Sequence, residues 1–171
     1  MKRRVLVIGA SFILLTVVWA NWPHSTLPDG IVADRVVVRK AERRLELYSS
    51  GQLLRSYPVS LGNEPRGPKR TEGDGRTPEG TYAIDYRNEA SSYCLSLHIT
   101  YPDAADSERA QQQGADAGGM IMIHGLPNRM GSIGRLHRLL DWTRGCIAVT
   151  NPEIREIARV VPNGTPIELL P

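Results

Sequence analysis

Aromatic residues are scarce in this chain of 171 residues, which holds one Phe, six Tyr and three Trp. Because 41% of the residues are hydrophobic, a core is still possible, and we expect aliphatic side chains to fill most of it. A strong excess of one charge is also lacking, since the net charge is only +3. Basic and aromatic residues do not interleave as they do in nucleic-acid platforms, so the composition argues against a nucleic-acid partner.

Cysteine is rare as well, with only Cys94 and Cys146 present. Structural zinc sites favour tight pairs such as C-x2-C, which the sequence lacks. Cys94 and His98 fall in a predicted strand, where a separation of four residues places them about 13 Å apart, too far to share one zinc ion. We therefore expect neither a metal nor another cofactor. The two cysteines could form a disulfide, or one could be buried and the other reactive.

Long hydrophobic runs are limited to one, at residues 5–20, which follows Lys2-Arg3-Arg4. This pattern is typical of a signal peptide or of an uncleaved membrane anchor. Residues 18–20 fit a cleavage site, and the run is somewhat shorter than the roughly 20 residues of a spanning helix. Both outcomes predict export to the periplasm or cell envelope, with membrane contact only through this segment if it is uncleaved. A buried N-terminal helix is less favoured, because the run is apolar on every face.

The rest of the chain predicts one β-rich α+β domain over residues 31–171, preceded by a linker at 21–30 that carries two prolines and a glycine. Residues 62–75 are rich in glycine, proline and charge, and predict a long, mobile, solvated loop. Asn151 is expected to be the N-cap of the last helix. We expect strands at 32–39, 44–48, 53–61, 81–86, 93–101, 120–123, 146–149 and 165–170, and helices at 103–113, 133–142 and 151–161.

The segment Thr143-Arg144-Gly145-Cys146 is the strongest chemical signal in the sequence. A glycine before a cysteine lets the backbone approach a ligand, and neighbouring N–H groups could then stabilise an oxyanion. The positive charge of Arg144 would favour the thiolate of Cys146. These four residues taken alone are equally compatible with a buried structural cysteine.

His124 is the best candidate for a base. It ends a short apolar strand and is followed by Gly125, so it can face a cleft and accept a proton from a thiol. A lone histidine is more often a hydrogen-bonded structural residue. The other histidines are weaker candidates, because they lie in the linker, in an alternating strand or in an arginine-rich helical stretch.

Several ordered motifs together resemble the L,D-transpeptidase (YkuD-like) catalytic domain family. The motifs span residues 32–171, nearly the whole of the predicted domain. A histidine is followed 22 residues later by the cysteine of a Ser/Thr-x-Gly-Cys block, and an asparagine, Asn151, lies downstream. The motifs are Pro58-Val59-Ser60-Leu61-Gly62, Thr77-Pro78-Glu79-Gly80-Thr81-Tyr82, Ile123-His124-Gly125, Ser132-Ile133-Gly134 and Thr143-Arg144-Gly145-Cys146-Ile147.

The resemblance implies a mixed β-sandwich-like fold with two or three short helices, and an enzyme acting on peptidoglycan stem tetrapeptides. Cys146 would attack the carbonyl of the third residue, D-alanine would leave, and a thioester would form. His124 would be the base, oriented by the carbonyl of Gly125. The amides of residues 144–146 would form the oxyanion hole, and Thr143 would shape the site.

The acyl acceptor stays open, because the chain departs from the common family pattern at Arg144, where many members have histidine, and at Ala148, where many have arginine. An amine acceptor gives a 3→3 cross-link, a lysine of an envelope lipoprotein gives protein attachment, and water gives an L,D-carboxypeptidase or amidase. A non-enzymatic wall-binding module stapled by a Cys94–Cys146 disulfide is the remaining alternative. If the chain is an enzyme, we expect both thiols to be unpaired and Cys94 to be buried in its strand.

Overall fold

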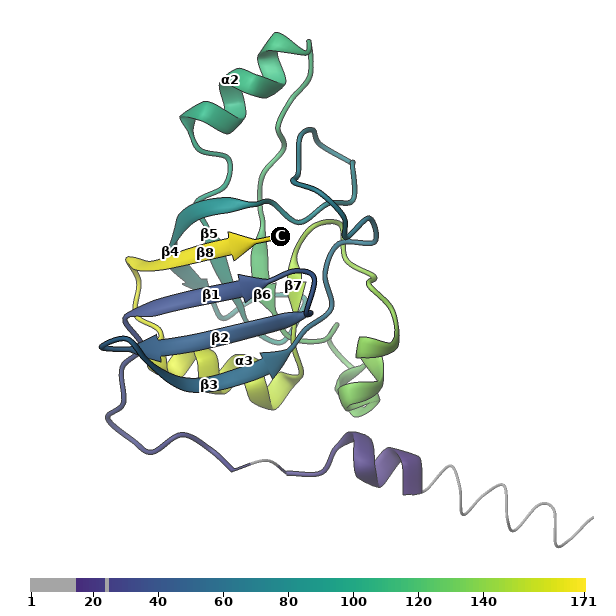
Figure 1. Cartoon of the computed structure of the whole chain (residues 1–171). Helices are drawn as coiled ribbons and strands as arrows, with labels where there is room; N and C mark the ends of the chain where they lie inside the picture. Colours follow the sequence, from purple (N-terminus) through teal and green to yellow (C-terminus); the bar gives the residue numbers. More distant parts are fainter. Residues whose placement is uncertain (1–14, 24) are drawn as a thin grey trace, which may run out of the picture.

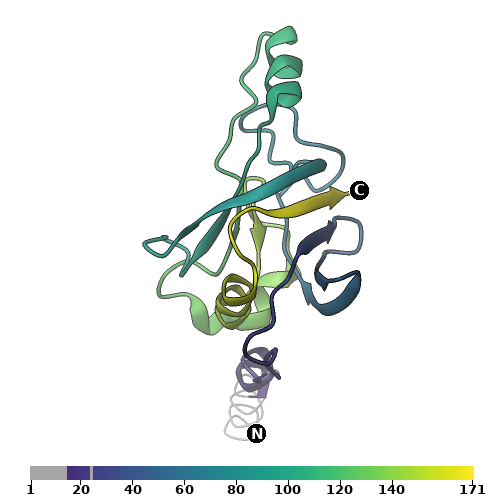
Figure 2. The same cartoon turned by 90° about the vertical axis from the view of Figure 1, so that its left-hand side faces the viewer.

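Eight strands form one mixed, curled sheet in the computed structural model, which describes residues 15–23 and 25–171 (Figure 1). The strand order is β3-β2-β1-β8-β4-β5-β6-β7. The predicted β-rich α+β class is confirmed, and Figure 2 shows how strongly the sheet curls. The strands are β1 (Arg35–Arg39), β2 (Arg44–Ser49), β3 (Gln52–Pro58), β4 (Gly80–Asn88), β5 (Ser96–Ile99), β6 (Met122–His124), β7 (Ile147–Ala148) and β8 (Thr165–Leu170).

β1 and β8 lie next to each other inside the sheet and pair in parallel, although they come from opposite ends of the domain sequence. β8 also pairs antiparallel with β4, so the last strand closes the sheet between two early ones. Val, Ile and Leu dominate the buried residues, which confirms the predicted aliphatic core. The aromatic members of the core cluster are Tyr57, Tyr82 and Tyr101.

Two α-helices of the domain begin close to the predicted positions. α2 (Ala104–Gln112) is preceded by its N-cap Asp103, whose carboxylate accepts the Asp106 N–H in a capping box. α3 (Asn151–Val160) lies against the sheet (Figure 1). Its N-cap is Thr150 and not Asn151, so that prediction was wrong by one residue. The Asn151 side chain is engaged elsewhere, as described below.

The predicted helix at 133–142 is a succession of 3-10 turns, η1 (Gly131–Leu139). The turns are interrupted at Gly134, which has a φ of 53°. The strand predicted at 93–101 is also shorter than expected, because β5 covers only Ser96–Ile99. Cys94 therefore lies in the turn before β5 with a φ of 66°, half-buried against the core, and the prediction that it is buried in a strand was wrong. Both cysteines are free thiols.

The loop at 62–76 was expected to be solvated and mobile, but hydrogen bonds and an ion pair within the loop hold it in one conformation. The Asp74 carboxylate accepts hydrogen bonds from the backbone N–H groups of residues 70, 71 and 76. It also binds the ammonium of Lys69 at 2.9 Å, and Lys69 is only 3% exposed. A carboxylate that accepts hydrogen bonds from several backbone amides gives a glycine-rich loop the hydrogen-bond partners that water would otherwise supply.

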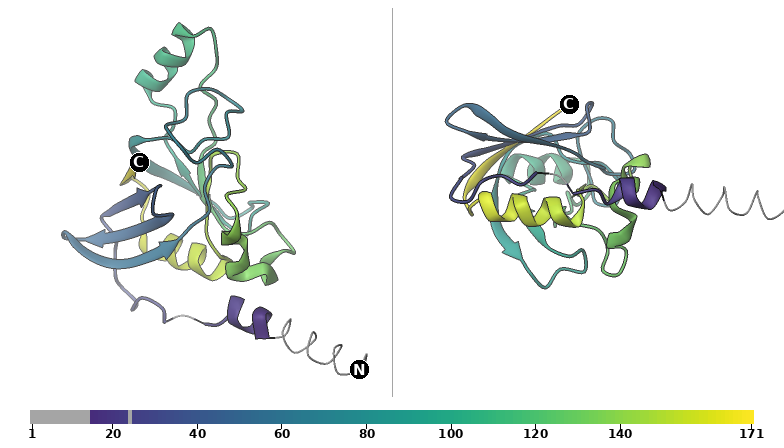
Figure 3. Two further views of the ribbon diagram at one scale, coloured as in Figure 1. Left: turned by 45° about the vertical axis from the view of Figure 1, so that its right-hand side comes forward. Right: turned by 90° about the horizontal axis from the view of Figure 1, so that it is seen from below.

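Residues 15–20 form a short helix beside η1, and the predicted linker is partly packed on the domain (Figure 3). Leu27 is buried, and its N–H donates to a carboxylate oxygen of Glu156 at 2.6 Å. The greater part of the hydrophobic run, residues 5–14, lies outside the described residues. Within the part of the chain that is described, no helix is long and apolar enough to cross a membrane.

Candidate active site

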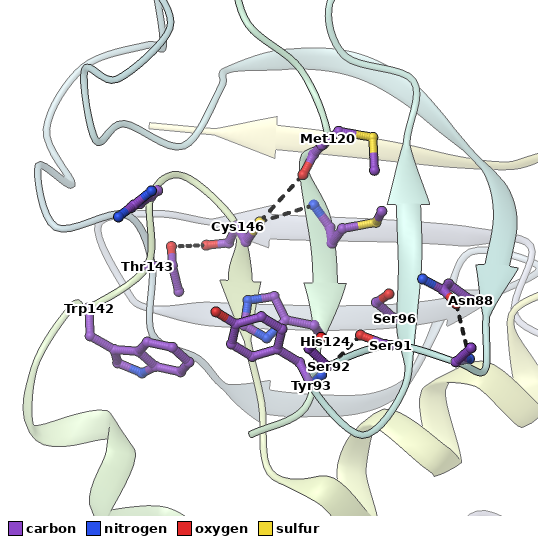
Figure 4. A pocket seen from close by; sticks show the side chains of 13 residues that line it. Asn88, Ser91, Ser92, Tyr93, Ser96, Met120, His124, Trp142, Thr143 and Cys146 are labelled. Atoms are coloured by element: carbon purple, nitrogen blue, oxygen red, sulfur yellow. Dashed lines mark hydrogen bonds between the residues drawn. The ribbon is translucent and has the colours of Figure 1, made fainter. Parts of the chain in front are cut away.

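His124 and Cys146 line one pocket of about 590 Å³ at the β6–β7 end of the sheet (Figure 4). β6 and β7 pair in parallel, with His124 in register with Ala148. His124 therefore ends one strand, while Cys146 immediately precedes the neighbouring one. The sheet thus brings together the two residues that the sequence singled out. Thr143, Arg144, Trp142 and Tyr93 are among the other residues of the pocket wall.

The His124 ring is fixed by its own turn and by two aromatic rings. Its Nδ1 lies 2.7 Å from the carbonyl oxygen of Gly125. Because a carbonyl only accepts, Nδ1 carries the hydrogen and Nε2 keeps a free lone pair. The ring centroids of Tyr93 and Trp142 lie 4.5 and 5.7 Å from that of His124. Burial lowers the pKa of His124, although the hydrogen bond to Gly125 opposes this effect, so the neutral base is favoured.

The Cys146 thiol is held by the backbone at the start of β6. Its Sγ accepts the Met122 N–H at 3.4 Å and donates to the Met120 carbonyl oxygen at 3.6 Å. Burial raises the pKa of Cys146, while the Met122 N–H and the charge of Lys69 oppose that rise. The cation that acts on the thiol is therefore Lys69 of the loop, and not Arg144, whose side chain is exposed. The free site pairs a neutral thiol with a neutral imidazole.

This pairing predicts how the pH affects the site. Because the pKa of His124 is lowered, the imidazole stays neutral at pH values where an ordinary histidine is protonated. The acid limb of kcat/KM should then lie below about 6.5. Alkylation of the free enzyme by iodoacetamide should rise with pH through a midpoint above about 8.5, because the pKa of the Cys146 thiol is raised. A Cys146→Ser variant gives the background from Cys94, and an alkylation midpoint near neutral pH would contradict the neutral pair.

The turn that presents the cysteine is held by Thr143. Its hydroxyl donates to the Cys146 carbonyl oxygen at 2.7 Å and accepts the Gly145 N–H at 3.1 Å. Gly145 was expected to supply an oxyanion-hole donor, but its N–H is already engaged in this bond. Among the described residues, the N–H groups of Arg144 and Cys146 donate to no acceptor, so these two remain as candidate oxyanion donors.

Three glycine backbones lie in contact beneath this turn. Gly145 has a φ of 120°, and a Cβ on it would lie 2.5 Å from the Arg76 carbonyl oxygen. A Cβ on Gly62 would lie 2.1 Å from the Gly75 carbonyl oxygen and 3.1 Å from the Gly145 Cα. The Thr143 N–H and carbonyl also bond the backbone at 61–63. The loop at 62–76 thereby supports the turn that carries Cys146.

We expect Thr143→Val to lower kcat/KM by about 10- to 100-fold, because valine keeps the volume but removes both hydrogen bonds that shape the turn. Thr143→Ser keeps the hydroxyl and is the matched control, with kcat/KM expected near that of the wild type. Steady-state rates on a stem tetrapeptide would measure both. Equal rates for the two variants would contradict the part assigned to the hydroxyl.

The Asn151 side chain has a structural role that the N-cap interpretation missed. Its Oδ1 accepts the Leu126 N–H at 2.8 Å, and so fixes the chain two residues after His124. A Cβ on Gly125 would lie 2.7 Å from this oxygen, and one on Gly131 would lie 2.6 Å from Nδ2. Asn151 is therefore a positioning residue for the turn after His124. Its match to the family's downstream asparagine was the only signal for this in the sequence.

Sequence reasoning also missed Tyr93 and the contact of Trp142 with His124. Tyr93 was placed in a strand, but it belongs to the turn before β5 and its ring lies over the imidazole. Cys94 and His98 do not line the pocket. The described residues contain no group of three or more His, Cys, Asp or Glu side chains that could hold a metal ion.

The structure has a curled mixed sheet in which a histidine ends one strand and a cysteine precedes the strand beside it, and both line one pocket. These features define a class of proteins with a Cys–His pair on neighbouring strands of the sheet. The L,D-transpeptidase catalytic domain family has a sequence model that matches residues 33–169 of this chain. The chain therefore belongs to that family.

Individual relatives agree with this assignment. The chain is 33% identical over 134 residues to the "Putative L,D-transpeptidase YafK" of Escherichia coli, which covers 74% of the chain and 46% of the relative. It is 29% identical over 142 residues to the "Putative L,D-transpeptidase YkuD" of Bacillus licheniformis, covering 80% and 66%. The chain thus spans about half the length of its relative from Escherichia coli.

Solved structures share the fold. The chain superposes on Pgp2 of Campylobacter jejuni, described as a helical cell shape determining protein, with a TM-score of 0.60, 25% identity and coverage of 91% of the chain and 54% of Pgp2. An L,D-transpeptidase from Mycobacterium smegmatis shows the same fold at 18% identity, with a TM-score of 0.52 and coverage of 81% and 59%. The predicted mixed-sheet fold of the family is therefore confirmed.

Proposed function

We propose that this protein is a cysteine-dependent L,D-transpeptidase that acts on peptidoglycan stem tetrapeptides in the cell envelope. One observation carries the proposal. His124 keeps Nε2 free for a proton while Nδ1 is bound to Gly125, and the pocket that it lines also contains the Cys146 thiol. A base with a fixed tautomer beside a thiol is the arrangement required for nucleophilic attack on a carbonyl carbon.

In the proposed acylation, Nε2 of His124 takes the proton from Sγ of Cys146 as the sulfur attacks the carbonyl of the third stem residue. The N–H groups of Arg144 and Cys146 bind the developing oxyanion. The protonated His124 then donates its proton to the leaving amine, D-alanine departs, and a thioester remains. A neutral pair suits this sequence, because the ion pair forms only as the attack proceeds.

In the second half of the reaction, neutral His124 removes a proton from the incoming amine. The amine nitrogen attacks the thioester, and the thiol leaves with that proton. Arg144 lies on the pocket wall with an exposed guanidinium, where it can bind a carboxylate of the stem peptide. The side chains of Ser91, Ser92 and Ser96 supply hydroxyl groups along another part of the same pocket (Figure 4).

Incubation with a purified disaccharide tetrapeptide, followed by mass analysis of the products, tests the proposal. We expect released D-alanine and a 3→3 cross-linked dimer. Free tripeptide in place of the dimer would show that water resolves the thioester and would replace transpeptidation by L,D-carboxypeptidase activity. Addition of an envelope lipoprotein with a free lysine tests the protein acceptor. Unchanged tetrapeptide under all conditions would overturn the proposal.

A further inference from the structure

The helix at 15–20 lies beside η1 at one end of the molecule (Figures 1 and 3). Apolar side chains of both segments are exposed there. Leu139, the last residue of η1, and Leu140, which follows it, are 78% and 74% exposed. Most of the large hydrophobic residues that the described chain exposes belong to this end. We call it the apolar end, and its exposed members are Leu15, Val17, Val18, Trp19, Trp22, Met130, Leu139 and Leu140.

The two parts of the apolar end are bound to each other. The Arg135 guanidinium donates to the carbonyl oxygens of Trp19 and Trp22 at 3.2 and 2.9 Å. Ala20 is only 2% exposed, and a Cβ on Gly134 would lie 2.4 Å from its carbonyl oxygen. The interruption of η1 at Gly134 is thus the place where the N-terminal segment docks. The exposed apolar residues of both segments therefore belong to one continuous surface.

A second pocket of about 310 Å³ opens in this surface. Its walls are almost entirely apolar, formed by residues such as Leu126, Met130, Leu136 and Leu140. Trp142 lines this pocket and the catalytic one as well. Exposing an apolar pocket and the apolar surface around it to water is unfavourable. Such surfaces usually mark a site that contacts a partner or a membrane.

The charges of the apolar end that have no ion-pair partner among the described residues are positive. Residues 126–140 contain three arginines and no acidic residue. Arg138 is paired with the Glu153 carboxylate of α3 at 2.6 Å, so the positive charges left at this end are those of Arg129 and Arg135. Residues 15–22 carry no charge. Arg129 is exposed and forms no ion pair within the described part of the chain. An apolar surface with a cationic rim is complementary to the surface of a membrane that contains anionic phospholipids.

The sequence indicates why a bilayer, rather than another protein, should cover this surface. The uncharged run at residues 5–20, preceded by Lys2-Arg3-Arg4, leads directly into the apolar end. Trp19 and Trp22 are both exposed there, and tryptophan is enriched where proteins meet the headgroup layer. Residues 15–20, the part of this run that the structure describes, therefore lie at the same end of the molecule as the exposed leucines.

We propose that the apolar end rests in the headgroup layer of an anionic phospholipid bilayer, so that the second pocket opens onto the lipid. The catalytic pocket then lies beside the membrane, since Trp142 separates the two, and α2 points away from it at the opposite end of the molecule (Figure 1). The inference rests on this surface alone and does not depend on the reaction proposed above.

A photo-crosslinking experiment on the full chain tests the inference. A benzophenone amino acid is placed at Leu139, or at Leu53 of β3 as a control that is also exposed but lies outside the apolar end. Each protein is reconstituted into vesicles of phosphatidylethanolamine and phosphatidylglycerol, irradiated and analysed by mass spectrometry. We expect phospholipid adducts at position 139 to exceed those at position 53 by at least about tenfold, because only position 139 enters the headgroup layer.

Two further arms separate the possible occupants. With the probe moved to Met130, a Leu139→Gln/Leu140→Gln variant should give several-fold fewer lipid adducts, and these exposed substitutions should leave turnover of soluble tetrapeptide unchanged. Replacing phosphatidylglycerol by phosphatidylcholine should also reduce the adducts at position 139. Equal lipid adducts at positions 139 and 53, or adducts at 139 with a second copy of the chain, would overturn the inference.

Discussion

Replacing Cys146 with alanine is expected to abolish both D-alanine release and cross-linking, while the protein stays folded. The thiol is the nucleophile of the proposed acylation, on which both products depend, and alanine removes the sulfur without adding bulk to the pocket. Mass analysis of tetrapeptide digests measures the activity, and thermal unfolding checks the fold. Cys94→Ala is the matched control and should keep the wild-type rate, because Cys94 does not line the pocket.

The same variants give a readout that does not require turnover. The family resemblance predicts that a carbapenem acylates Cys146, so the intact mass of the wild type and of Cys94→Ala should rise by one inhibitor. Cys146→Ala should show no increase. Activity that persists in Cys146→Ala, or an adduct that survives in it, would remove Cys146 from the role of nucleophile.

Replacing His124 with glutamine is expected to slow acylation by about 10²- to 10⁴-fold, the usual contribution of a general base. Glutamine can still form hydrogen bonds but cannot take up the proton. Single-turnover acylation of Cys146 by a carbapenem, followed by mass spectrometry, measures this step. The acid limb described above should also disappear from the residual activity, because the titrating base is gone.

His98→Gln is the control for this experiment. His98 lies on the neighbouring strand β5, paired with Asp85 at 2.6 Å and stacked on Tyr86, outside the catalytic pocket. Its replacement should leave acylation unchanged. An unchanged rate in His124→Gln would point to another base. His137 is a poor substitute, because its ring is hydrogen-bonded to Ser60 and does not line the catalytic pocket, and burial lowers its pKa to about 4.

The parts of the fold that follow from local chemistry could be predicted from the sequence. α2 begins after Asp103 and ends before Gly114 because a capping box and a left-handed glycine act within a few residues. The strands β1 and β2 follow from runs of Val and from alternating apolar residues. Cys146 and His124 were predicted as the reactive pair because each is flanked by glycine near the end of a short apolar strand, and because the ordered motifs around them resemble those of the family. The structure places both in one pocket, and their catalytic roles stay a prediction.

Features that depend on contacts between distant segments could not be predicted in this way. The glycine-rich loop at 62–76 appeared mobile, because nothing local indicates that Asp74 would cap its amides or that Lys69 would be buried. Asn151 has the side chain of an N-cap, and only the position of Leu126 shows that its oxygen is used elsewhere. Tyr93 reaches His124 only because β5 starts later than its alternating pattern suggests.

The close approach of Gly62, Gly75 and Gly145 has a consequence for how variation in this protein would be interpreted. In a saturation-mutagenesis screen for activity, these three positions should reject nearly every substitution. A Cβ on Gly62 or Gly145 would collide with a backbone carbonyl of the loop, and one on Gly75, which has a φ of 68°, would collide with the Asn63 side chain. In such a screen, substitutions at these glycines would be as poorly tolerated as substitutions at Cys146 and His124. The screen would thus identify as essential three residues that have no side chain to contribute to the chemistry.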